Sequence, residues 1–247
     1  MSEISIKAEE IFQISGWPVT NAVLLSALAV LVILGASLLL RGKLSLLPGK
    51  FQLIFEFLIE EILKLMDAVL GSRRLSLKYL PFVATIFLFI LTSNWLGLLP
   101  VIGPVGIKTA HSNPGLVPLF RSPASDLNFT IALAVISVLS VNFLAITALG
   151  FKKHFSKFFT FRDPILSFTG LLEFISEFVK IISFSFRLFG NVFAGEVLLV
   201  IVGFLVPYFL PLPFIFLEIF VGFIQAFIFS MLTLVFIGMA TNEEPAH

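Results

Sequence analysis

Long apolar runs alternate with short polar stretches along this chain, and the runs are long enough to cross a lipid bilayer. A helix needs about 20 residues to span roughly 30 Å of hydrocarbon. The segments that reach this length are 19–40, 79–99, 127–150, 165–206 and 212–240. The pattern therefore predicts an all-α membrane protein, a single integral membrane domain over 1–247 with about five transmembrane helices.

The segment 49–70 is apolar on one side only. At 100° per residue its charged residues fall on one half of a helix, and Ile59, Ile62, Met66 and Val69 fall on the other. This pattern predicts an amphipathic helix that lies on the membrane surface. The alternative is a helix packed against partner subunits.

Lys and Arg residues near the ends of the spans predict the orientation. Segments that lie inside when the N-terminus is outside hold eleven of them, whereas outer segments hold only Lys7, Lys108 and Arg121. The outer N-terminal segment 1–18 is polar and acidic before the first apolar run, so no cleaved signal peptide is expected. We expect a cytoplasmic C-terminus and a bacterial inner membrane, with an organelle membrane as the alternative.

Composition supports a membrane location and excludes several classes of site. The chain is 58% hydrophobic and 13% charged, with a net charge of +1, no cysteine and three histidines. These numbers leave no disulfide framework or thiolate metal site, and the scattered histidines suggest no metal cluster. Basic residues sit in short clusters between apolar runs, so the lipid membrane is an expected partner, and neither nucleic acid nor a cofactor is expected.

The outer loop 100–126 is rich in Gly, Pro, Ser and Asn, which predicts irregular structure. Within "SPASDLN", Ser125 or Asp126 is expected to cap the next helix, although Asp126 is also a candidate for ion entry. In "TSNWLG", Asn94 is either a buried amide bonded to a neighbouring helix or a functional group.

The stretch "FRLFGNVFAGE" places Arg187 in the middle of an apolar run. None of the residues three or four positions away is acidic; they are Ser183, Phe184, Gly190 and Asn191. A guanidinium cannot shed its proton, and a charge within the membrane is costly when it is unpaired. The counter-charge of Arg187 must therefore come from elsewhere.

Polar residues of this run form one narrow stripe on a helical wheel. The stripe consists of Glu173, Glu177, Lys180, Arg187 and Asn191, whereas Glu196 points in a different direction. The first three are spaced to satisfy one another near the inner surface. A helix over 165–206 would be about twice as long as the hydrocarbon is thick, so it must tilt or bend.

The last two segments are expected to pack as an antiparallel hairpin that turns near residues 206 and 207, where prolines are frequent. Equal depth then places Gln225 beside Arg187 and Glu218 beside Glu196. Two carboxylates in one membrane cavity can pass protons between them. The alternative is two unrelated acids that face headgroups or loops.

The combination "SFRLFGNVFAGE" and "IQAFIF" resembles subunit a of the F-type ATP synthase. The stretches "ISIKAEEIFQISGWPVTN", "SNWLGLLP" and "SDLN" are similar to the same family, so the resemblance covers nearly the whole chain. It implies a stator beside a rotating ring of c subunits, together with subunit b of the peripheral stalk and the remaining ATP synthase subunits. ATP chemistry is expected on those other subunits, because no GxxxxGK loop occurs here.

The resemblance also implies roles for individual residues. Arg187 matches the essential arginine that faces a ring carboxylate, and Asn191 matches the polar residue beside it. The residues that match the proton path are Glu196, Glu218 and Gln225 at the outer half-channel, Asn94 and Asp126 toward its entrance, and Glu173 at the inner exit. Family members often carry histidine at one of the positions held here by Glu196 and Glu218, which leaves the protonation order of this pair open.

Two other interpretations remain open at this stage. A proton-coupled secondary transporter would also place Arg and Glu at mid-membrane, although the chain shows no internal repeat. A scaffold without ion traffic would not need Arg187 for proton pumping.

Overall fold

The computed structural model describes residues 8–14, 17–41, 49–99, 106–107, 117–151, 154, 164–207 and 209–241. Its long helices are α1 (Asn21–Arg41), α2 (Lys50–Leu70), α3 (Arg73–Gly97), α4 (Leu127–Leu149), α6 (Pro164–Leu205) and α7 (Pro211–Thr241). Within these ranges, every one of these helices except α2 is long and apolar enough to span a membrane, which makes five candidate spans. The predicted fold class is confirmed.

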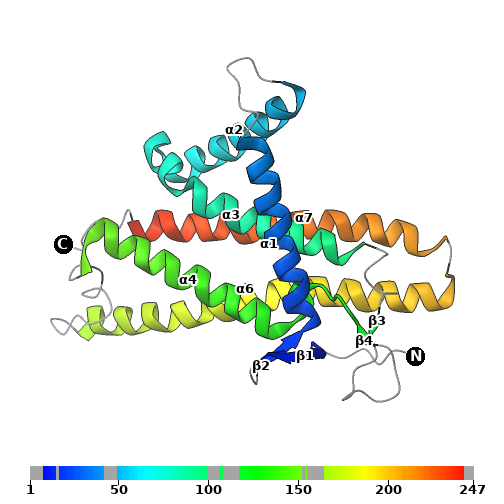
Figure 1. Ribbon diagram of the computed structural model, residues 1–247. Helices are drawn as coiled ribbons and strands as arrows, with labels where there is room; N and C mark the ends of the chain where they lie inside the picture. The colour runs from blue at the N-terminus through cyan, green and yellow to red at the C-terminus, as the bar shows by residue number, and fades with distance from the viewer. Residues whose placement is uncertain are drawn as a thin grey trace.

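Helices α6 and α7 form the longest part of the molecule. They contain 42 and 31 residues, so α6 is about 60 Å long at 1.5 Å per residue. The two helices run in opposite directions from their shared turn and contact each other, with α4 between their far ends, and α1 runs crosswise to them (Figure 1). If α1 stands upright in a bilayer, the α6–α7 hairpin is steeply inclined in it.

The core lies where α3, α4, α6 and α7 meet. Phe184 of α6 is buried against two rings of α7, with its ring centroid 4.7 Å from that of Phe229 and 5.6 Å from that of Phe236. Buried hydroxyl pairs join the helices at two levels: Thr130 to Ser185 at 3.0 Å and Ser137 to Thr233 at 3.0 Å. Such pairs let small polar residues hold helices together in lipid.

Short strands occur at one end of the molecule, on the side of the N-terminal segment (Figure 1). They are β1 (Glu10–Ile14) paired with β2 (Trp17–Thr20), and β3 (Gly106–Ile107) paired with β4 (Val117–Pro118). Asn21 joins the two hairpins, because its backbone N–H donates to the Glu9 carbonyl at 3.1 Å and its side-chain amide donates to the Pro118 carbonyl at 3.3 Å. These strands were not predicted from the sequence, and β3 and β4 lie within the loop 100–126 that was expected to be irregular.

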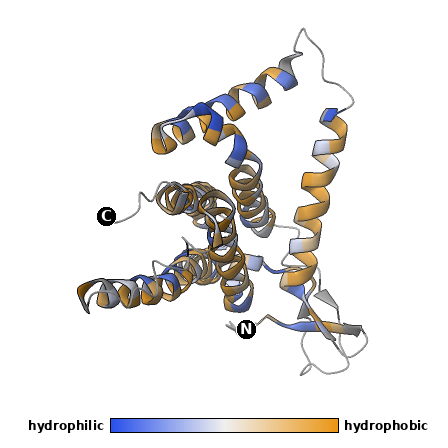
Figure 2. Cartoon of the chain, turned by 90° about the vertical axis from the view of Figure 1, so that its left-hand side faces the viewer, coloured by the Kyte–Doolittle hydropathy of each residue, from blue (hydrophilic) through white to orange (hydrophobic). Residues whose placement is uncertain are grey.

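Helix α2 is amphipathic, as expected, and carries more hydrophilic residues than the largely hydrophobic α1 (Figure 2). Its buried side is formed by Leu63, Met66 and Leu70, whereas Ile59 and Val69, expected on the apolar side, are exposed. Met66 packs in a cluster with residues of α3 and α7, so this side faces protein of the same chain.

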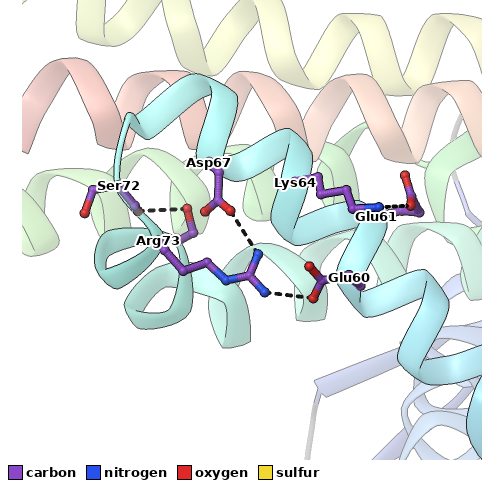
Figure 3. Close-up of polar contacts among 7 residues, drawn as sticks. Glu60, Glu61, Lys64, Asp67, Ser72 and Arg73 are labelled. Atoms are coloured by element: carbon purple, nitrogen blue, oxygen red, sulfur yellow. Dashed lines mark hydrogen bonds and ion pairs between the residues drawn. The ribbon is translucent and has the colours of Figure 1, made fainter.

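Charged residues of α2 are connected to the start of α3 (Figure 3). Arg73 donates to Asp67 at 2.9 Å and to Glu60 at 2.7 Å, and Lys64 donates to Glu61 at 2.7 Å. The Ser76 hydroxyl and the Arg73 guanidinium lower the pKa of Asp67. This cluster fixes the sharp corner between the helices, where Gly71 adopts φ 66°, a left-handed conformation that favours glycine.

Candidate functional site

Arg187 lies near the middle of α6 and is only partly exposed. Its Nη2 donates to the hydroxyl of Ser183, one turn earlier, at 3.3 Å. Among the described residues, no carboxylate forms an ion pair with Arg187. A neutral hydroxyl does not balance the charge of a guanidinium, so the described part of this chain leaves that charge uncompensated.

The face of α6 around Arg187 is open and lined by small residues. Ser183, Gly190, Asn191 and Ala194 are all exposed. A Cβ added at Gly190 would have no heavy atom within 4 Å outside its own helix backbone and chain neighbours. Small residues on a lipid-facing helix allow another helix to approach closely, so this face can accept a partner helix beside the guanidinium.

One turn beyond Arg187, a pair of amides joins α6 to α7. The Asn191 side chain donates to the Gln225 carbonyl oxygen at 2.6 Å. Gln225 is buried, and its amide nitrogen has no hydrogen-bond partner among the described residues. The sequence predicted Gln225 beside Arg187, and the hydrogen bond to Asn191 places the Gln225 amide about one helical turn from the level of Arg187.

Glu218 of α7 packs directly against α6 at Gly195. Its carboxylate occupies the space where a side chain on residue 195 would lie, so only glycine permits this approach. Glu218 is buried, and no hydrogen bond or ion pair joins its carboxylate to another described residue. The adjacent residue on α6 is Glu196, and the structure therefore brings acids of both helices to the same level of the hairpin.

Glu196 differs from Glu218 because it faces a cation. Its Oε1 lies 3.6 Å from Nε of Arg121, whereas its Oε2 is buried without a hydrogen-bond partner among the described residues. Arg121 comes from the outer loop, just before the 3₁₀-helix η1 (Pro123–Ser125). Arg121 was not predicted as a site residue. The one signal in the sequence that could have found it is that outer segments contain few cations.

Asn94 and Trp95 connect α3 to the same stretch of α7. The amide of Asn94 donates to the Gly222 carbonyl at 3.2 Å, and the indole N–H of Trp95 donates to the Ile219 carbonyl at 3.1 Å. Asn94 is therefore a buried amide bonded to a neighbouring helix, one of the two interpretations left open. Its Oδ1 is buried and has no hydrogen-bond partner among the described residues, so it can still accept a hydrogen bond from water.

Asp126 caps helix α4. Its carboxylate accepts a hydrogen bond from the backbone N–H of Asn128 at 3.0 Å, and Ser125 makes no such cap bond. Asp126 is buried close to Arg121 in the chain. The expected capping role is confirmed, and a role in ion entry remains a prediction.

Toward the other end of α6, polar groups satisfy one another. Glu177 forms an ion pair with Lys180 at 2.6 Å and accepts from the Asn142 amide at 2.9 Å, while the carbonyl of Asn142 lies 3.1 Å from His154 Nε2. Beside this network is a cavity of about 10 Å³, room for one water molecule, which Ser137 also lines. Glu173 lies one turn from Glu177 on α6 and is partly exposed.

Within the described parts of the chain, no three His, Asp or Glu residues are grouped as metal ligands would be. The arrangement contains carboxylates, amides and a guanidinium along two helices. Such groups can hold and transfer protons or face a charged partner, but they offer no nucleophile activated by a base.

Comparison with known proteins agrees with this chemistry. Residues 23–238 match the family model described as "ATP synthase A chain". The chain is similar to ATP synthase subunit a of Campylobacter jejuni subsp. jejuni serotype O:23/36, with 33% identity over 223 residues, 89% of each chain. It is also similar to ATP synthase subunit a of Mycobacterium ulcerans, with 34% identity over 233 residues, 92% of this chain and 89% of the relative.

Proposed function

This chain belongs to the ATP synthase A chain family, and from that premise we propose that it is the stator subunit that carries protons to and from a rotating ring. Membership makes it an integral membrane component of an ATP synthase complex. The proposal adds two aqueous half-channels, one on each side of Arg187, and a ring of c subunits that carry one membrane carboxylate each. ATP chemistry takes place on other subunits.

The observation that carries this proposal is the guanidinium of Arg187, which has no acidic partner in the described chain and lies on an open face of small residues. A permanent charge in lipid requires a counter-charge. The ring carboxylate supplies it, and the exposed positions Ser183 and Gly190 leave room for the ring helix that brings it. Because a guanidinium does not release its proton, Arg187 also separates the two half-channels.

The outer half-channel is built around Glu196 and Glu218, with Asn94 and Asp126 toward its entrance. A proton from outside reaches these carboxylates and then neutralises a ring carboxylate, which can enter lipid at much lower cost than the anion. The amides of Asn191 and Gln225 lie between the acids and Arg187 on the hairpin, where they can hold water or a passing proton by hydrogen bonds.

The inner half-channel passes Glu173. A ring carboxylate that has completed nearly a full turn meets water of this half-channel as it approaches Arg187. The guanidinium then favours the ionised form of the carboxylate, and the proton leaves past Glu173. The driving free energy is about 2.3 kcal/mol per elementary charge for each 100 mV of membrane potential.

Orientation and partners complete the proposal. The excess of Lys and Arg in the inner segments places the N-terminus outside and the C-terminus in the cytoplasm. A bacterial inner membrane agrees with the bacterial sources of the relatives. Subunit b of the peripheral stalk and the c ring are the expected direct partners, and a secondary transporter that works alone is not favoured by a family match across most of the chain.

The test is ATP-driven proton pumping in membrane vesicles that contain the whole complex. Arg187→Ala is expected to abolish pumping while the amount of assembled complex is unchanged. Arg74→Ala removes an exposed arginine at the start of α3 and is the matched control, which should pump normally. Normal pumping by an assembled Arg187→Ala complex would refute the proposed function.

A further inference from the structure

Arg121 is a buried arginine, and the proposed function gives it no role. Its side chain is 9% exposed. Its Nε donates to the Ser125 hydroxyl at 3.0 Å, and its Nη2 lies 3.5 Å from the Ser125 carbonyl. Ser125 is itself fully buried in η1. The outer loop therefore holds the guanidinium of Arg121 next to the α6–α7 hairpin.

The guanidinium faces a carboxylate of the transmembrane hairpin. The distance of 3.6 Å between Arg121 Nε and Glu196 Oε1 is longer than the 2.7–2.9 Å that is usual for a charge-assisted hydrogen bond. The interaction is therefore chiefly coulombic, and Arg121 is shielded from water whereas the Glu196 side chain is 38% exposed. Since no short hydrogen bond from a described residue occupies Oε1, a proton or a water molecule can still reach it.

Arg121 forms no such ion pair with the second acid, Glu218. Glu218 lies against Gly195, and no described residue forms an ion pair with it. Two neighbouring carboxylates without a cation tend to share one proton, because both cannot be ionised at low cost. A cation on one side of such a pair makes the two acids unequal, which gives a proton a direction of transfer.

We propose that Arg121 is a positioning residue of the outer half-channel, which holds the Glu196 carboxylate turned toward the outer loop so that it accepts protons from outside and passes them to Glu218. This inference rests on the proposed function. In each passage a proton moves from water to Glu196 and then to Glu218, and the Glu196 carboxylate is restored beside the guanidinium. Arg121 itself neither gains nor loses a proton.

The test compares ATP-driven pumping by complexes that carry Arg121→Gln, Arg121→Lys, Glu196→Gln and the double variant Arg121→Gln/Glu196→Gln. Arg121→Gln is expected to pump about tenfold more slowly, because the Glu196 carboxylate loses the cation that orients it for proton transfer. Arg121→Lys keeps the charge and is expected to retain more than about half of the wild-type rate. The double variant should be no slower than Glu196→Gln alone, because Arg121 acts through Glu196.

Arg74→Gln, which removes an exposed arginine far from Glu196 in the chain, is the control and should pump normally. A wild-type rate for Arg121→Gln, or losses that multiply in the double variant, would overturn the proposal, since a merely structural role of Arg121 gives independent losses. If Arg121→Gln does not assemble, Arg121→Lys decides, because an assembled lysine variant with a tenth of the normal rate also contradicts the proposal.

Arg187→Ala in the same membranes separates the two levels of inference. Pumping by Arg187→Ala would refute the proposed function itself. Loss of pumping in Arg187→Ala together with a wild-type rate for Arg121→Gln would refute only the role of Arg121.

Discussion

The two ends of α6 carry similar residues in very different states. Toward its start, Glu177 is bonded to both Lys180 and Asn142, so its charge and its oxygen atoms are satisfied within the chain. Toward its end, Glu196 has one oxygen atom without a hydrogen-bond partner among the described residues. Glu218 of α7, at the same level, forms no ion pair with any described residue. Satisfied groups stabilise the fold, whereas unsatisfied buried groups are available for chemistry.

Arg187 lies between these ends and resembles the unsatisfied acids Glu196 and Glu218. Its neutral hydroxyl partner leaves its charge uncompensated, and its face of α6 is open. Function is therefore assigned by the state of each polar group and not by its residue type, because a glutamate that faces a cation occurs at both ends.

The largest difference in pumping rate is expected between variants of Glu218 and Glu177. Glu218→Gln removes a carboxylate of the proposed outer path and is expected to slow ATP-driven pumping more than tenfold, a typical loss for a group that transfers protons. Glu177→Gln is expected to keep pumping within about twofold but to destabilise the protein by about 1–3 kcal/mol, because Lys180 loses its partner. Pumping rates and thermal unfolding of the purified complexes measure the two effects; the reverse pattern would break the comparison.

A smaller effect is expected from Gly195, which lets the Glu218 carboxylate approach α6. A methyl group at this position would overlap the carboxylate and push it aside. Gly195→Ala should therefore slow pumping several-fold while the complex still assembles. Gly203→Ala is the control on the same helix, since a Cβ there meets nothing within 4 Å, and it should stabilise the helix by about 0.5–1 kcal/mol. Equal pumping by both variants would show that this contact does not position Glu218.

The exposed ion-pair cluster between α2 and α3, formed by Glu60, Asp67 and Arg73, is satisfied within the chain and lies apart from the proposed proton path. The pKa of Asp67 is lowered by the Ser76 hydroxyl and the Arg73 guanidinium, so its contribution to stability is present above its unfolded pKa of about 3.9 and is lost as pH falls through its folded pKa. The corner between the helices should therefore loosen only in acid. Spin labels at Ala68→Cys and Leu77→Cys, in a chain without native cysteine, should report a broader distance distribution at low pH.

Asp67→Asn is the control for the spin-label measurement. It removes the titrating group, so the corner should be equally loose at neutral and at low pH. A label distribution that broadens in acid to the same extent in Asp67→Asn would assign the effect to another group.

Much of the fold was predictable from the sequence because lipid imposes long apolar segments. The apolar runs coincide with the spanning helices, and the prolines near residue 207 indicated the α6–α7 turn. The register of the hairpin was also close to the predicted one, since Glu218 lies against Gly195 and Phe184 against Phe229. The hydrogen bond between Asn191 and Gln225 was not predicted, because it depends on side-chain conformation as well as on register.

The strands and the position of Arg121 were not predictable for a different reason. Strands of two to five residues depend on pairing with another segment, and their own sequence carries little periodicity. The contact between Arg121 and Glu196 joins an irregular loop to a distant helix, and no periodic pattern encodes such a contact. By contrast, the unusual charge of Arg187 was visible because its own helix contains no acid at contact spacing.

The central claim is that a neighbouring subunit brings a carboxylate to the face of Arg187, and cysteine crosslinking tests it most directly. Gly190→Cys places a unique thiol on that face, and Leu139→Cys, 61% exposed on α4, is the control. A cysteine next to the carboxylate of the ring subunit should form a disulfide with residue 190 and not with residue 139. An assembled complex that shows no crosslink at residue 190, or equal crosslinking at both positions, would contradict the account.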